Sequence, residues 1–188
     1  MKKLKWFNWL CFLVLVSLLI YVYVGNLGLI RESIGQNSAN ETLVELTAGS
    51  EVGQSFKYHQ NNLSGVSFKL ATFMRNNTGK LQVGIRELRE DRDIYQVKIE
   101  ASSIKDNEFY DFRFPPIKSS KGKEYYVYIK SIDGKEGLSI TAYGSDVDTY
   151  KEGDLFINGV MENRDLTFKV FYNRTIFNFI GDRISSLF

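Results

Sequence analysis

The sequence predicts a mainly-β protein with one N-terminal transmembrane helix, an antiparallel β-sandwich and a short C-terminal helix. Two observations lead to this expectation. The stretch from Trp6 to Ile30 has no charged residue, and at about 1.5 Å per helical residue it is long enough to cross the roughly 30 Å apolar layer of a bilayer. From about residue 43 to residue 172, apolar residues recur at every second position, which is typical of strands with one buried face.

Basic residues precede the apolar stretch. Because positive charge is retained on the cytoplasmic side of a membrane, Lys2, Lys3 and Lys5 predict that the start 1–5 is cytoplasmic and that the remainder of the chain is extracytoplasmic. Aromatic side chains are also placed at both ends of the stretch 6–30, as in the aromatic belts of membrane interfaces. These predicted anchor residues are Trp6, Trp9, Tyr21 and Tyr23.

A cleaved secretory signal and a lipoprotein cysteine are the two other interpretations of this stretch. A cleaved secretory signal is shorter and ends in small residues, whereas this run ends in the bulky sequence Tyr21-Val22-Tyr23-Val24. A lipoprotein cysteine follows small residues, whereas Asn8, Trp9 and Leu10 precede Cys11. We therefore interpret 6–30 as an uncleaved signal-anchor and Cys11 as an ordinary apolar residue within it.

The charge balance outside the anchor is close to neutral. The chain has 24 Lys and Arg against 22 Asp and Glu, and three of the lysines precede the anchor. A near-neutral domain of mixed charge gives no electrostatic reason to expect a nucleic-acid partner. With the single cysteine inside the anchor, the outer part has no disulfide framework and no thiol chemistry.

The segment 31–42 is polar and without periodicity, so we interpret it as a stalk before a single ectodomain at 43–173. Many short alternating segments follow, separated by turn-forming clusters and without a strong helical pattern between them. This spacing favours an antiparallel sandwich over an α/β fold. Pro115-Pro116 is expected to end one strand, because proline cannot donate to a ladder. The predicted strands are Leu43–Leu46, Gln54–His59, Val66–Leu70, Leu81–Ile85, Tyr95–Ile99, Phe109–Phe114, Glu124–Ile132, Leu138–Tyr143, Leu155–Ile157 and Leu166–Tyr172.

The tail 174–188 has a different pattern. Ile176, Ile180, Ile184 and Leu187 recur at helical spacing, so an amphipathic helix is expected. Two interpretations of it remain open. The helix packs on the sandwich, or it lies at the membrane surface or docks on a partner protein.

Several motifs in the range 53–173 resemble a known domain. In their order along the chain they are similar to the uncharacterised jelly-roll ectodomains of bacterial membrane proteins, which are also found attached to multi-span glycosyltransferases. The resemblance implies a carbohydrate-module-like sandwich in the cell envelope and transfers no catalytic residue; this chain has no transferase portion. The motifs are Gly53-Gln54-Ser55-Phe56, Asn62-Leu63-Ser64-Gly65-Val66, Leu70-Ala71-Thr72, Asp106-Asn107-Glu108, Phe112-Arg113-Phe114-Pro115-Pro116-Ile117, Ser120-Lys121-Gly122-Lys123-Glu124-Tyr125-Tyr126, Ile157-Asn158-Gly159 and Asp165-Leu166-Thr167-Phe168.

The residues needed for common catalytic sites are scarce. His59 is the only histidine, and no nucleophile turn accompanies it. Paired carboxylates hydrolyse glycosides, and Glu87 with Glu90, Asp91 or Asp93 have the sequence spacing for such a pair. A dense charge run more often forms a solvated strand end and loop. We therefore expect no enzyme, with a glycoside hydrolase as the alternative.

A structural calcium ion is the cofactor that this sequence permits. Sandwiches hold calcium with carboxylates and carbonyl groups in loops, and Asp106, Asn107 and Glu108 form such an oxygen-rich cluster. The fixed spacing of an EF-hand loop is absent.

Tyrosines are the main candidates for ligand contacts. Alternation along one strand places Tyr126 and Tyr128 on the face opposite Tyr125. Aromatic faces stack on the apolar faces of sugar rings, so Tyr126, Tyr128 and Tyr143 are the predicted glycan-binding residues. The predicted function is a membrane-anchored, extracytoplasmic recognition domain for a cell-envelope glycan. The alternative is an accessory or scaffold subunit that binds another membrane protein through the sandwich or the tail helix.

Overall fold

The computed structural model of the chain describes residues 2–24, 28–176 and 180. These residues form two compact units. One unit contains the two ends of the chain, up to Arg31 and from Asn173 onwards, and the other contains Glu32–Tyr172. The two units are described separately.

The first unit contains helix α1 (Lys2–Val24), which is 23 residues long. Its large apolar side chains are exposed, including Trp6, Trp9 and Phe12. The helix ends before the predicted limit of the anchor at Ile30, because strand β1 begins at Gly28. Within the part of the chain that is described, no helix reaches the length and hydropathy of a membrane span.

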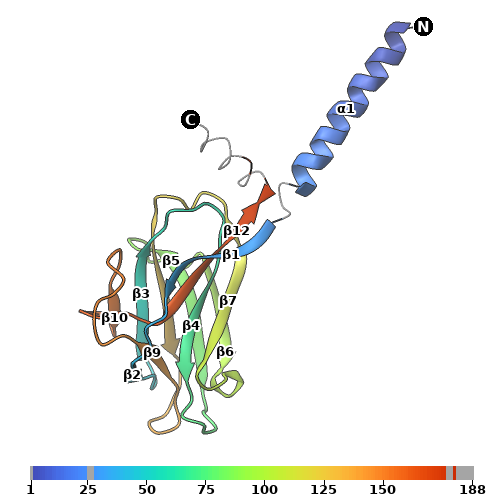
Figure 1. The fold of residues 1–188 in the computed structure, drawn as a ribbon. Coiled ribbons are helices and arrows are strands. Elements are labelled where there is room, and N and C mark those ends of the chain that lie inside the picture. Colours follow the sequence, from blue (N-terminus) through green and yellow to red (C-terminus); the bar gives the residue numbers. More distant parts are fainter. Residues whose placement is uncertain (1, 25–27, 177–179, 181–188) are drawn as a thin grey trace. The chain divides into compact units, whose positions relative to one another are not determined.

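The second unit is built from two antiparallel sheets that pack face to face (Figure 1). This confirms the predicted mainly-β sandwich. We call the sheets A and B, and each has six strands. In sheet A, β4 pairs with β7 along one edge and with β12 and β9 along the other. The next strands outward are β1, which pairs with β12, and β2, which pairs with β9. The strands of sheet A are β1 (Gly28–Gln36), β2 (Glu41–Glu45), β4 (Leu63–Ala71), β7 (Glu108–Ile117), β9 (Thr141–Gly144) and β12 (Phe168–Thr175).

Sheet B has the order β11-β10-β3-β8-β5-β6. A short 3-10 helix, η1 (Ala101–Ser103), follows β6 and leads towards β7 in sheet A. The strands of sheet B are β3 (Glu51–Lys57), β5 (Lys80–Glu87), β6 (Tyr95–Glu100), β8 (Glu124–Ser131), β10 (Leu155–Ile157) and β11 (Val160–Glu162).

The core lies between the inner faces of the two sheets. Phe56 of β3 links them, because its ring centroid lies 5.8 Å from that of Tyr125 in sheet B and 6.1 Å from that of Phe168 in sheet A. Tyr58 completes this aromatic cluster, with an edge contact to Phe56 at 6.0 Å. Burial of these rings supplies the hydrophobic stabilisation that a chain without disulfides needs. The other large side chains that are fully buried among the described residues are Phe68, Leu46, Leu63, Leu70, Ile85, Ile129, Ile140 and Leu155.

All ten predicted strands are found, with ends shifted by a few residues. The predicted stalk at 31–42 is wrong for most of its length, because β1 continues to Gln36 and β2 begins at Glu41. Pro115-Pro116 does not end its strand but lies inside β7. The reason is that β7 pairs only with β4, and the two prolines fall where the register of that pairing shifts, between the pair of Leu63 with Ile117 and the pair of Gly65 with Arg113, so the ladder is already interrupted there.

Only part of the predicted tail 174–188 belongs to the described residues. Strand β12 runs to Thr175, past the predicted domain limit at residue 173. Of the predicted helix over 176–188, only Ile176 and Ile180 belong to the described residues, so that helix lies outside them.

Candidate functional site

Strand β8 presents different side chains to the two faces of sheet B. Tyr125, Val127 and Ile129 belong to the hydrophobic core between the sheets. Tyr126 and Tyr128 alternate with them and therefore lie on the outer face of sheet B. This confirms that the two tyrosines share the face opposite Tyr125. We refer to Tyr126 and Tyr128 together as the tyrosine floor.

The two rings lie flat against the sheet because glycines leave room beneath them. Their centroids are 6.1 Å apart and their planes differ by 19°. A Cβ atom added to Gly53 would come within 2.3 Å of Cζ and Oη of Tyr126. A Cβ atom added to Gly84 would come within 2.5 Å of the same atoms of Tyr128. Glycine in a strand interior often marks such a close approach.

Each phenol hydroxyl is held by a carboxylate. Tyr126 Oη donates to Glu51 Oε1 at 2.9 Å. Tyr128 Oη donates to Asp93 Oδ2 at 2.6 Å and accepts from Gln82 Nε2 at 2.8 Å. Burial, reinforced by these carboxylates, raises the pKa of Tyr128 to about 12 and raises the pKa of Tyr126 even further. Both hydroxyls therefore remain protonated donors at neutral pH.

A cation lies on the tyrosine floor. The guanidinium carbon of Arg86 is 4.7 Å from the ring centroid of Tyr126 and 5.3 Å from that of Tyr128. Phe156 contacts Tyr126 edge-on at 5.7 Å. With these neighbours in place, only 6% of Tyr126 and 2% of Tyr128 are exposed. A ligand that stacks on the floor must therefore displace Arg86.

Two hollows adjoin the site. One, of about 510 Å³, is lined by residues 48–51 together with Lys130, Asn158 and Gly159. The other, of about 310 Å³, is lined by Glu87, Glu90, Arg92, Asp93 and Ile94. Glu51 and Asp93, the two carboxylates that bind the tyrosine hydroxyls, each line one of them. The floor and both hollows are therefore connected by hydrogen-bonding groups.

The third predicted ligand residue lies elsewhere. Tyr143 belongs to β9 in sheet A, where it is half-buried and has Lys69 Nζ 5.1 Å from its ring centroid. Tyr126 and Tyr128 belong to sheet B. The structure therefore does not bring the three predicted tyrosines into one site.

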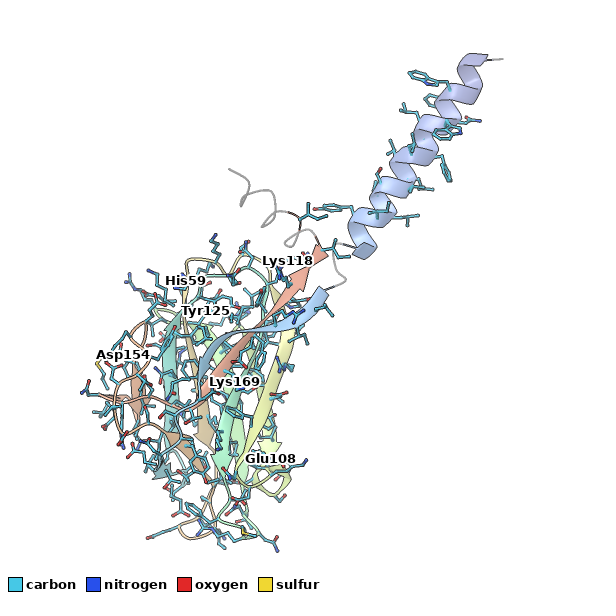
Figure 2. The ribbon with its side chains drawn as sticks, viewed as in Figure 1. His59, Glu108, Lys118, Tyr125, Asp154 and Lys169 are labelled. Atoms are coloured by element: carbon cyan, nitrogen blue, oxygen red, sulfur yellow. The ribbon has the colours of Figure 1, made fainter. Side chains whose placement is uncertain are left out.

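The predicted calcium ligands form a turn before and into β7. Asp106 Oδ1 accepts hydrogen bonds from Thr72 N at 2.6 Å and from Thr72 Oγ1 at 2.9 Å. Hydrogen bonds from Thr72, with smaller contributions from the amides of Met74 and Phe73, hold the pKa of the Asp106 carboxyl below its usual value. Asn107 has φ 58°. Glu108, at the opposite end of the sandwich from His59 (Figure 2), pairs with Lys105 at 3.5 Å.

Among the described residues, no group of three or more His, Cys, Asp or Glu side chains is positioned to hold a metal ion. Calcium at residues 106–108 stays a prediction, which a calorimetric calcium titration would test.

The structure brings together only some of the residues predicted as candidates for hydrolysis. His59 forms an ion pair with Glu152 at 3.0 Å, and both side chains are about half exposed. Glu87, Glu90 and Asp93 share the smaller hollow, but Glu87 is paired with Lys123 and Asp93 holds Tyr128. Asp91 does not line this hollow.

Four residues around the tyrosine floor were not singled out as site residues from the sequence: Arg86, Glu51, Gln82 and Phe156. They come from strands whose register the sequence does not reveal. The signal that was available is the pair of isolated glycines, Gly53 and Gly84, inside alternating strand patterns.

The sequence matches no known protein-family profile and no curated protein. Among the solved structures, it is similar to the crystal structure of a ruminal GH26 endo-β-1,4-mannanase. The identity is 11% and the TM-score is 0.34; the match covers 80% of this chain and 27% of that chain. The chain thus spans about a quarter of the length of the mannanase.

Proposed function

We propose that the sandwich is a non-catalytic, jelly-roll-type recognition domain for a cell-envelope glycan, which binds on the outer face of sheet B. The observation that carries the proposal is the tyrosine floor, a pair of nearly parallel rings 6.1 Å apart that lie on the sheet. The apolar face of a pyranose ring stacks on such a surface. The two rings are held in place over Gly53 and Gly84 before binding. Arg86, which covers them, has to move when the sugar stacks on the floor.

The polar groups around the floor suit the hydroxyls of a sugar. Glu51 and Asp93 offer carboxylate oxygens, while Gln82 and Asn158 offer amides. A ligand site usually combines an aromatic or apolar surface with a few polar groups that point towards the ligand. The two hollows provide space for further sugar units beyond the ring that stacks on the floor.

Binding of the full-length chain, purified in detergent micelles, to a broad glycan panel tests the proposal. Measurements with and without calcium would test the predicted ion as well. We expect saturable binding that is lost in Tyr128→Ala and reduced in Tyr126→Ala. Tyr143→Ala is the matched control, because this tyrosine lies on sheet A. Loss of binding in Tyr143→Ala alone would assign the glycan to the other sheet, and no binding to any glycan would reject the proposed function.

The absence of enzymatic activity is part of this proposal. Glu87, Glu90 and Asp93 line the same hollow. Two of these carboxylates are engaged, Glu87 with Lys123 and Asp93 with Tyr128. A general acid needs a carboxyl group whose pKa and position suit the scissile bond. We expect glycans that bind to be recovered intact after prolonged incubation.

We also propose that the segment 6–30 anchors the domain in a membrane with the N-terminus in the cytoplasm. The supporting observations are the uncharged sequence, the preceding lysines and the aromatic residues at both ends. Extraction of membranes at alkaline pH tests it, since an anchored chain stays with the lipid. Protein recovered from the medium with a new N-terminus near Gly25 or Asn26 would reject the anchor.

A second candidate function is docking on another membrane protein. One loop supports it, because Phe73 and Met74 after β4 are 51% and 90% exposed and have φ of 56° and 54°. Two consecutive large residues with positive φ are unusual, and such strain accumulates at functional sites. A photo-crosslinking residue at position 74 should capture one identified membrane protein, and the same residue at the exposed position 91 should not. Equal capture at both positions would reject this function.

A further inference from the structure

We propose that the sugar bound at the tyrosine floor carries a positive charge, as in an amino sugar with a free, protonated amine. This inference rests on the proposed function and specifies the class of glycan. Three features of the site lead to it: the position of Arg86, an unsatisfied oxygen of Asp93, and the lack of close cationic partners for the carboxylates of Glu51 and Asp93.

The first feature is that the floor already binds a cation from its own chain. The guanidinium of Arg86 lies over both rings, with its central carbon 4.7 Å and 5.3 Å from the two centroids. The faces of aromatic rings attract cations within about 6 Å. Arg86 therefore occupies the position in which a charged ligand would gain the same attraction.

The second feature is an oxygen of Asp93 that lacks a donor. Asp93 Oδ2 accepts from Tyr128, whereas Oδ1 is buried and accepts no hydrogen bond from the protein. Its nearest cationic atom is Nη1 of Arg86 at 4.0 Å, which is too long for a hydrogen bond. A buried acceptor without a partner is costly, so Asp93 Oδ1 favours a ligand that brings a donor to this point.

The third feature concerns charge. Glu51 and Asp93 lie on opposite sides of β8, in β3 and in the loop before β6. Among the described residues, Glu51 takes part in no ion pair, and Asp93 has only the long pair with Arg86. When a neutral sugar displaces Arg86, Asp93 loses its only cation. An ammonium group on the sugar replaces that cation, so the exchange is favourable for a charged ligand.

Two oligosaccharides with the same backbone, one charged and one neutral, test the inference: a tetramer of β-1,4-linked glucosamine and its fully N-acetylated counterpart. Binding to the full-length chain in micelles is measured at mildly acid pH, where the free amines are protonated. We expect the charged tetramer to bind at least about tenfold more tightly. We also expect this preference to shrink at high ionic strength.

Asp93→Asn keeps the shape of the side chain and removes its charge. We expect it to abolish most of the preference for the charged tetramer. Asp91→Asn is the matched control, because Asp91 is exposed and lies two residues from Asp93 without lining the hollow. Arg86→Gln removes the competing cation and should raise the affinity for the charged tetramer severalfold. A lower affinity in Arg86→Gln, with the fold retained by circular dichroism, would overturn the inference.

The outcomes separate this inference from the proposed function. Equal or tighter binding of the acetylated tetramer, lost in Tyr128→Ala, would overturn the positive charge and leave glycan recognition in place. If the chain bound only other, uncharged glycans, the positive charge would likewise be overturned and glycan recognition would stand. A preference for the charged tetramer that Asp93→Asn leaves unchanged would overturn the assignment to Asp93. No binding to any glycan would reject both proposals.

Discussion

Gly84 of β5 lies directly beneath the ring of Tyr128 of β8, so closely that a methyl group at its Cβ position would come within 2.5 Å of the phenol Cζ and Oη atoms. The two residues are register partners in adjacent strands. The glycine thus determines the height at which the ring lies above the sheet, and with it the position of the hydroxyl that binds Asp93.

Gly84→Ala should therefore destabilise the sandwich. The ring of Tyr128 has to shift to make room for the added methyl group, and overpacking of this kind costs about 1–3 kcal/mol in the free energy of unfolding. Chemical denaturation measures it. In a Tyr128→Ala background the same substitution should cost much less, because the ring that clashes is absent. An equal cost in both backgrounds would show that Gly84 is needed for another reason.

Asp165 should be among the residues to which the fold is most sensitive. It is 1% exposed, and its Oδ2 accepts hydrogen bonds from Thr149 Oγ1 at 3.0 Å and Tyr150 N at 2.7 Å. Asp165→Ala removes the acceptor of these partly buried hydrogen bonds and leaves a cavity at a buried position, so we expect a loss of about 3 kcal/mol in the free energy of unfolding. Asp154→Ala is the control, because that side chain is exposed. Similar losses in both variants would contradict this account.

Asp106 should order the loop that carries Phe73 and Met74. Its carboxylate accepts from the amide and hydroxyl of Thr72 and lies near the next two amides. In Asp106→Ala we expect faster hydrogen exchange at the amides of residues 72–74, whereas Glu108→Ala at the exposed ion pair should leave them unchanged. Unchanged exchange in Asp106→Ala would show that the loop is held by other contacts.

The same carboxylate predicts a response to acid. Its hydrogen bonds lower its pKa in the folded state below the ordinary value of 3.8. The stabilisation is thus fully present above pH 3.8 and is lost as the pH falls through the lower, folded-state pKa. Denaturation curves at decreasing pH should show a smaller acid-dependent loss for Asp106→Ala than for the unchanged protein. Parallel pH profiles would contradict this linkage.

Buried tyrosines predict unfolding at alkaline pH. Burial raises the pKa of Tyr125 and Tyr128 to about 12, from an ordinary value of 10.0. A raised folded-state pKa means that stability is fully present below pH 10 and is lost as the pH rises towards 12. Denaturation at increasing pH should show this decline, with a shallower decline in Tyr128→Phe. Titration of tyrosinate absorbance without loss of the fold would contradict it.

The strands of the sandwich were predictable because most of them bury one face. Leu81, Val83 and Ile85 alternate with polar residues, and they enter the core as the pattern predicts. Strand β1 gave no such signal, because only Gln36 among its residues is buried. Strand β11 has three residues and none is buried, so it is defined by pairing with β10 and has no pattern of its own.

Only the part of the site that lies within a single strand could be predicted from the sequence. Alternation within β8 shows that Tyr126 and Tyr128 share a face, but it does not show what lies against them. Arg86, Glu51 and Asp93 reach the floor through cross-strand register and through a loop, and both depend on the folded sheet. For the same reason Tyr143 was grouped with the other two tyrosines, although it belongs to the opposite sheet.

The pairing of β4 in sheet A has a consequence for the order of events during synthesis. Phe68 in β4 pairs with Phe168 in β12. Because β12 is the last of the described strands in the sequence, it is also the last of them to leave the ribosome. Until β12 is available, β4 presents one unpaired edge and the inner aromatic cluster lacks the ring of Phe168. Sheets joined from such distant segments form slowly, in roughly milliseconds to seconds. A nascent chain must therefore be protected from aggregation until the residues of β12 have been made.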